Sequence, residues 1–88
     1  MQPDTLARTI TLIRAHLSGH RSPHSVPAIT AESSFERDLR CDAIDMVCIE
    51  LAAEDEFHVR FPAERMEACE TVGDLAELVR VLIKEPVL

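Results

Sequence analysis

The sequence is poor in aromatic residues and in glycine. Its 88 residues include three Phe, two Gly, no Tyr and no Trp. Single-stranded nucleic acids are usually bound by stacking their bases on aromatic side chains, and this chain has few side chains for that purpose. The net charge of −7 also repels phosphate backbones. We therefore expect no nucleic-acid partner, and we expect basic proteins as partners instead.

Long apolar runs and paired cysteines are missing as well. No stretch approaches the ~20 apolar residues of a membrane span, and Arg8 and Arg14 interrupt the first apolar segment, which argues against a signal peptide. The three Cys, at positions 41, 48 and 69, form no CxxC pair and no even set. This usage is typical of a reducing compartment. We expect a cytoplasmic monomer without membrane insertion.

Helical periodicity is the main structural signal. A hydrophobic content of 47% favours a folded chain, which we interpret as a single domain over residues 1–88. A first stripe predicts a helix over residues 3–18 that ends before Gly19, and its members are Leu6, Ile10, Ile13 and Leu17. A second helix is predicted over residues 43–57, with Asp42 as its N-cap and Asp45 in its first turn.

The second helix is expected to bury the apolar stripe that starts near its beginning, formed by Ile44, Val47, Cys48 and Leu51. A short helical turn with Met66 is predicted after Pro62. The last helix should begin at a capping box of Thr71 and Asp74 and end at Pro86, with Leu75 and Leu78 in the core.

Residues 19–41 interrupt the helical pattern with two Pro, one Gly and four Ser. We expect a long loop there, anchored in the core by Ile29, Phe35 and Leu39. The fold class predicted for the whole chain is all-α. It is a small four-helix bundle, with three main helices, a short third helix and the long loop between helices one and two.

Almost all of the net charge lies in one segment. Residues 41–57 contain no Lys or Arg and six acids, which are Asp42, Asp45, Glu50, Glu54, Asp55 and Glu56. An ordinary run of charges is usually a solvated helix face. The complete lack of compensating bases favours a docking surface for a basic partner.

Two catalytic or metal interpretations are weaker. Asp42 and Asp45 have no His, Ser or Lys at helical spacing after them, so we interpret them as a cap and a docking charge. His16, His20 and His24 are spaced by four, but a shared face would require the first helix to continue through Gly19, and no Cys or acid lies nearby. We expect solvated loop histidines, no metal site and no enzymatic activity.

The cysteines also have competing interpretations. Cys41 lies two residues before Ala43 and could be an exposed, reactive thiol, but the neighbouring acids should raise its pKa and so oppose the thiolate. Cys48 and Cys69 are expected to be small core residues.

Residues 35–79, FERDLRCDAIDMVCIELAAEDEFHVRFPAERMEACETVGDLAELV, resemble the acyl carrier protein family. In that family a loop ending in Asp-Leu-Gly-x-Asp-Ser-Leu leads into an acidic second helix. An acidic-aromatic helix end, an extended apolar-Pro segment, a short third helix and a Thr-Val-x-Asp-capped last helix follow. The matching positions are Asp38, Leu39, Asp42, Ile44, Asp45, Val47, Glu50, Leu51, Glu56, Phe57, Pro62, Thr71, Val72 and Asp74.

The chain departs from this pattern at two places. Arg40-Cys41 replaces the Gly-x pair, which is tolerable if position 40 does not need a positive φ. Ala43 stands where the family has its modified Ser. The resemblance implies that this Ser attacks coenzyme A on a Mg²⁺-dependent phosphopantetheinyl transferase and gains a 4′-phosphopantetheine arm, whose thiol carries acyl groups. The methyl group of Ala43 cannot form that phosphodiester.

The resemblance implies a non-enzymatic acyl carrier for fatty-acid or related lipid assembly. The start at Met1 close to the first helix, and the lack of a Gly-Gly-rich lead-in, favour the freestanding type. The resemblance places the arm at position 43, beside Asp42. It also implies docking of the transferase and of acyl-handling enzymes with basic surfaces onto Asp42, Ile44, Asp45, Glu50, Glu54 and Asp55.

Two interpretations of Ala43 remain open. It can be a deliberate Ser→Ala change that keeps the protein unmodified, which we favour because the flanking pattern is so well kept. Alternatively, the chain is a natural non-acylated acidic module that docks basic partner proteins.

Overall fold

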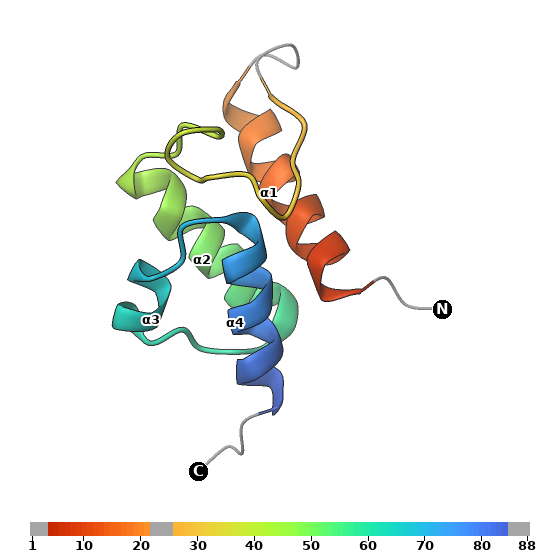
Figure 1. The fold of residues 1–88 in the computed structure, drawn as a ribbon, viewed down its shortest axis with the longest axis vertical. Helices are drawn as coiled ribbons and strands as arrows, with labels where there is room; N and C mark the ends of the chain where they lie inside the picture. The colour runs from red at the N-terminus through yellow and green to blue at the C-terminus, as the bar shows by residue number, and fades with distance from the viewer. Residues whose placement is uncertain (1–3, 22–25, 85–88) are drawn as a thin grey trace.

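The computed structural model describes residues 4–21 and 26–84. They form four helices in the order α1 (Thr5–His20), α2 (Ala43–Phe57), α3 (Ala63–Glu67) and α4 (Val72–Lys84) (Figure 1). The predicted all-α bundle with a short third helix and a long first loop is confirmed. None of the helices in this part of the chain is both long and apolar enough to cross a membrane.

The predicted caps of α2 and α4 are present. Asp42 accepts a hydrogen bond from the backbone N–H of Asp45 at 2.8 Å, and the Asp45 carboxylate accepts one from the N–H of Asp42 at 3.1 Å. At α4, the Thr71 hydroxyl accepts from the N–H of Asp74 at 3.1 Å, and Asp74 accepts in return from the N–H of Thr71. Both reciprocal pairs satisfy N–H groups that have no partner inside the helix.

The first helix runs two residues beyond its predicted end. α1 starts after Asp4, whose carboxylate accepts from the N–H of Ala7 at 2.7 Å, and it continues through Gly19 to His20. The prediction that Gly19 lies past the helix was wrong. Glycine is only mildly unfavourable in a helix, and here its φ is not positive, so it need not end one.

The core lies where α1 packs against both α2 and α4. Ile13 and Leu17 of α1 are fully buried there, as the sequence stripe predicts, and Leu6 and Ile10 of the same stripe pack against the cluster with partial burial. The remaining helices add fully buried Ile49, Ala53, Val72, Leu75 and Val79.

The buried face of α2 differs from the predicted one. Ile44, Val47 and Leu51, predicted as core, are 73%, 52% and 58% exposed. The row that points inward is instead Ile49, Ala53 and Phe57. Helix α2 carries apolar residues on more than one side, so periodicity alone could not decide which row faces α1.

The long loop docks onto the start of α4. Ile29, Phe35 and Leu39 are buried, which confirms them as anchors. The N–H of Phe35 donates to the carbonyl of Glu70, and the N–H of Val72 donates to that of Ser33, each at 3.0 Å. Residues 29–39 of the loop are therefore part of the packed domain.

Besides the apolar core, a polar contact joins α1 to the end of α2. The Arg8 guanidinium pairs with the Glu56 carboxylate at 2.8 Å and donates to the Glu56 carbonyl at 3.2 Å. It also lies over the Phe57 ring, 4.5 Å from the centroid. Glu56 is therefore engaged within the domain, although it belongs to the acidic segment.

The two glycines give opposite predictions. A Cβ at Gly73 would lie 2.9 Å from the Ala31 carbonyl oxygen, whereas nothing lies within 4 Å of one at Gly19. We expect Gly73→Ala to destabilise the fold by about 1–3 kcal/mol through overpacking. Gly19→Ala should stabilise it by about 0.5–1 kcal/mol through helix propensity. Urea unfolding of both variants checks this, and equal stabilisation by both would contradict the packing of the loop on α4.

Candidate functional site

Ala43 is the first residue of α2 and is exposed to solvent. Its side chain ends in a methyl group and offers no oxygen for a phosphodiester. The hydroxyls of Ser34 and Thr71 each accept a backbone hydrogen bond. The Ser34 Oγ accepts from the N–H of Arg37 and the Thr71 Oγ1 accepts from that of Asp74, both at 3.1 Å. The residues at this position therefore do not fit covalent attachment of the arm.

Asp45 is held from two helices. Its Oδ1 lies 2.9 Å from the Nε2 of His16 on α1, while its Oδ2 takes part in the capping box with Asp42. The side chain is only 19% exposed. The hydrogen bond from His16, followed by that from the Asp42 backbone, lowers the pKa of Asp45, so the carboxylate stays ionised. Asp45 thus has an internal role, and docking through it remains a prediction.

Arg21 completes this arrangement and was not recognised in the sequence. Its guanidinium donates to the carbonyl of Leu39 at 2.6 Å and to that of Arg40 at 3.1 Å, and it lies 3.8 Å from the Asp45 carboxylate. We call Arg21, His16 and Asp45 the anchor cluster. It ties the end of α1 to the segment that leads into Ala43, a contact between residues about 20 positions apart that no local motif reveals.

The histidine prediction needs correction. His16 is a largely buried residue of α1, bonded to Asp45, and it is no solvated loop side chain. His24 lies outside the described residues. Within residues 4–21 and 26–84, no group of three or more His, Cys, Asp or Glu side chains is arranged to hold a metal ion.

Arg40 adopts a left-handed backbone conformation with φ of 54°. The condition under which Arg40 could replace Gly without strain is therefore not met. A non-glycine residue in this region costs about 1–2 kcal/mol, because its Cβ crowds the following carbonyl. The two hydrogen bonds from Arg21 to the carbonyls of residues 39 and 40 hold the backbone there.

An apolar row lies on the exposed side of α2. We call Ile44, Val47 and Leu51 the exposed row; they lie one, four and eight residues after Ala43. Three large aliphatic side chains on one solvent-facing helix face are the type of patch that marks a contact surface. The prediction for Ile44 as a docking residue is compatible with this exposure, because its side chain is free to meet a partner.

The acids around the exposed row differ in solvent exposure and in hydrogen bonding. Asp42 and Asp55 are exposed, whereas Glu50 and Glu54 are half-buried. The Glu54 carboxylate accepts a hydrogen bond from the N–H of Phe61 at 2.8 Å and so fixes the segment after α2. Burial, with a smaller contribution from Glu54, raises the pKa of Glu50.

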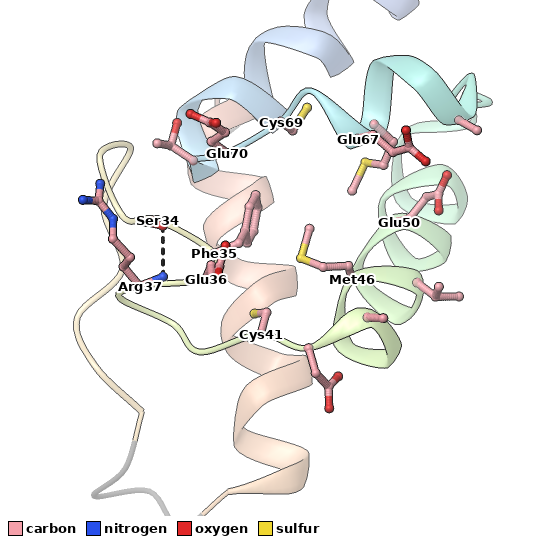
Figure 2. A pocket seen from close by; sticks show the side chains of 16 residues that line it. Ser34, Phe35, Glu36, Arg37, Cys41, Met46, Glu50, Glu67, Cys69 and Glu70 are labelled. Atoms are coloured by element: carbon pink, nitrogen blue, oxygen red, sulfur yellow. Dashed lines mark hydrogen bonds between the residues drawn. The ribbon is translucent and has the colours of Figure 1, made fainter.

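A cleft of about 950 Å³ opens beside Ala43 (Figure 2). Its walls come from the loop over residues 34–37, the start of α2, α3 and residues 69–71. Figure 2 shows Phe35 and Met46 projecting into it from the loop and from α2. Four Glu side chains line it, at positions 36, 50, 67 and 70.

Two of the three cysteines also line this cleft. Burial raises the pKa of Cys41 to about 11, with Asp45 and Asp42 adding to the rise and Arg21 opposing it. Burial likewise raises the pKa of Cys69. The predicted direction for Cys41 is confirmed, although burial outweighs the acids. Both thiols are neutral near pH 7 and are poor nucleophiles. Cys69 packs against the core cluster with partial burial, whereas Cys48 is half-buried and is less buried than the core prediction required.

We expect Arg40→Gly to be more stable than Arg40→Ala by about 1 kcal/mol, because only glycine tolerates the positive φ without strain. Both variants remove the same charge, so the comparison isolates the backbone. Chemical denaturation of the two proteins measures the difference. If the alanine variant were as stable as the glycine variant, the left-handed conformation at position 40 would be wrong.

The comparisons with known proteins point to one family. The family described as "Phosphopantetheine attachment site" matches residues 23–79. The chain is 37% identical over 68 residues to "Acyl carrier protein 3" of Ralstonia nicotianae, covering 77% of this chain and 78% of that protein. It is 41% identical over 51 residues to an acyl carrier protein of Clostridium perfringens (58% and 67%). It is 37% identical over 57 residues to one of Clostridium acetobutylicum (65% and 74%). The chain thus belongs to the acyl carrier protein family, whose members are carriers and not enzymes.

Proposed function

We propose that this chain is an acyl carrier scaffold for fatty-acid or related lipid assembly, working in the cytoplasm as a monomer. Position 43 is the attachment point for 4′-phosphopantetheine when it is Ser, and Ala43 leaves the protein unloaded. The observation that carries the proposal is the exposed row, which begins directly after Ala43 and has acids on its borders.

The exposed row and the acids serve different parts of docking. Burial of Ile44, Val47 and Leu51 against a partner supplies apolar contact area at the centre of an interface. The docking carboxylates, at Asp42, Asp45, Glu50, Glu54 and Asp55, attract a basic surface and set its orientation. A phosphopantetheinyl transferase or an acyl-handling enzyme with a basic surface fits this chemistry.

The cleft supports a carrier role for a serine-bearing form. Its rim includes Ala43 itself, and its interior includes Phe35, Met46 and Met66. An arm attached at position 43 would therefore start beside an apolar space. An acyl chain on the arm can be sheltered there from water, as the resemblance to the family implies.

A second candidate function is an acidic binding module that occupies basic partners and never carries acyl groups. The observation that favours it is Ala43 itself, because every other feature of the docking surface is complete without the arm. The two functions share the same surface and differ only in whether position 43 is ever loaded.

Restoring the hydroxyl separates these candidates. We expect Ala43→Ser, incubated with coenzyme A, Mg²⁺ and a phosphopantetheinyl transferase, to gain the mass of one phosphopantetheine, because the arm position is exposed. The measurement is intact-protein mass spectrometry, with the Ala43 chain as the unmodified control. If the serine variant gains no mass with several different transferases, the binding module is the better description.

The exposed row gives a second prediction in the Ala43→Ser background. We expect Ile44→Ala combined with Leu51→Ala to lower kcat/KM for loading by roughly tenfold or more, since two central apolar contacts are lost. Thermal stability should stay unchanged, because neither side chain is in the core. Ile83→Ala is the control, since Ile83 is 52% exposed on α4. If Ile83→Ala lowered kcat/KM equally, the exposed row would not be a specific docking surface.

A further inference from the structure

The cleft beside α2 combines an apolar interior with an acidic rim. Phe35 and Met66 are buried in its floor, and the half-buried Met46 adds a third apolar side chain. The neutral thiols of Cys41 and Cys69 lie on the same walls. Its volume of about 950 Å³ is within the range of small-molecule sites, roughly 300–1,000 Å³.

The charges on the rim are almost all negative. Glu36 comes from the loop, Glu50 from α2, Glu67 from α3, and Glu70 from the segment before α4. Figure 2 shows these carboxylates around the opening, with Arg37 as the one cation of its lining. Among the described residues, none of the four makes a side-chain hydrogen bond or ion pair, so their charges are available to a ligand.

We propose that this cleft binds, without any covalent arm, an organic cation that carries an apolar chain, such as a long-chain alkylammonium. The chain packs on the apolar floor and the cationic head pairs with the glutamates of the rim. The proposal concerns the Ala43 protein as it exists and does not depend on loading at position 43.

Charge complementarity selects this ligand over a fatty acid of the same length. The cleft is lined by five acids, the four glutamates and Asp42, and by one base, Arg37. A carboxylate head would therefore be repelled by most of the charges at the opening, whereas an ammonium head would be attracted by them. The partial burial of Glu50 strengthens the preference, because a buried carboxylate gains from a cationic partner. Each methylene moved from water onto the floor should raise the affinity by about fourfold.

The three cysteines provide the readout. Cys41 and Cys69 line the cleft, while Cys48, on α2, lies outside its lining. The Ala43 chain is reacted with a maleimide at about pH 8, where some thiolate forms, and modification at each cysteine is followed by mass spectrometry. The probes are dodecyltrimethylammonium, dodecanol and dodecanoate, each below its micelle concentration, with circular dichroism to verify folding.

We expect dodecyltrimethylammonium to slow modification of Cys41 and Cys69 by about tenfold or more, because a bound chain covers both thiols, and to leave Cys48 unchanged. Dodecanoate should bind about tenfold or more weakly than the ammonium, with dodecanol between them. Equal binding of the three probes, equal protection of all three cysteines, or no protection would overturn the proposal.

A charge variant tests the rim. Glu50→Gln with Glu67→Gln should weaken ammonium binding by about tenfold and leave dodecanol binding unchanged. The matched control is Glu32→Gln with Glu64→Gln, two exposed acids outside the cleft, which should bind like the parent chain. Should the test variant fail to fold, the salt dependence decides. Ammonium binding to the parent chain must weaken at about 1 M salt, where charges are screened beyond ~3 Å, and salt-independent binding overturns the proposal.

Discussion

The anchor cluster is the constraint on which the rest of the site depends. Asp45 is the third residue of α2 and closes its capping box with Asp42. Its carboxylate also contacts His16 and lies near Arg21. Arg21 of this cluster donates hydrogen bonds to the carbonyls of Leu39 and Arg40, and so holds the backbone where Arg40 has its strained positive φ. Asp45 contacts both His16 and Arg21, and Arg21 also holds the carbonyls of residues 39 and 40, so the start of α2, the end of the loop and the end of α1 are fixed together. The position of Ala43 follows from that arrangement.

Helix α2 has two apolar rows with separate roles. The inward row of Ile49, Ala53 and Phe57 stabilises the domain against α1 and α4. The exposed row contributes nothing visible to folding, yet it leaves three large aliphatic side chains in water. Soluble domains rarely expose such a patch without using it for binding. In the proposed function, stability and docking are thus separated on one helix, so the outer surface can change without loss of the core.

Much of this fold could be predicted from the sequence, because local signals determine it. The bounds of α2, the two reciprocal caps and the loop anchors follow from spacing and capping chemistry. Three features could not be predicted: the direction in which α2 faces, the engagement of Arg21 with residues 39 and 40, and the positive φ at Arg40. Each depends on contacts between distant segments. Burial of Cys41 likewise depends on contacts between distant segments, and burial is the main cause of the raised pKa of its thiol.

The anchor cluster also changes what the surroundings of Ala43 mean. Asp42 caps α2, Asp45 joins it to α1, and Leu39 is fully buried in the core. These residues would be needed to fold the domain whether or not position 43 ever received an arm. Their presence is therefore weak evidence about loading. The exposed row is better evidence, because it has no visible role in folding and is explained by a partner. The surface beside Ala43 is a docking surface in both candidate functions, and the difference between them is a single hydroxyl oxygen.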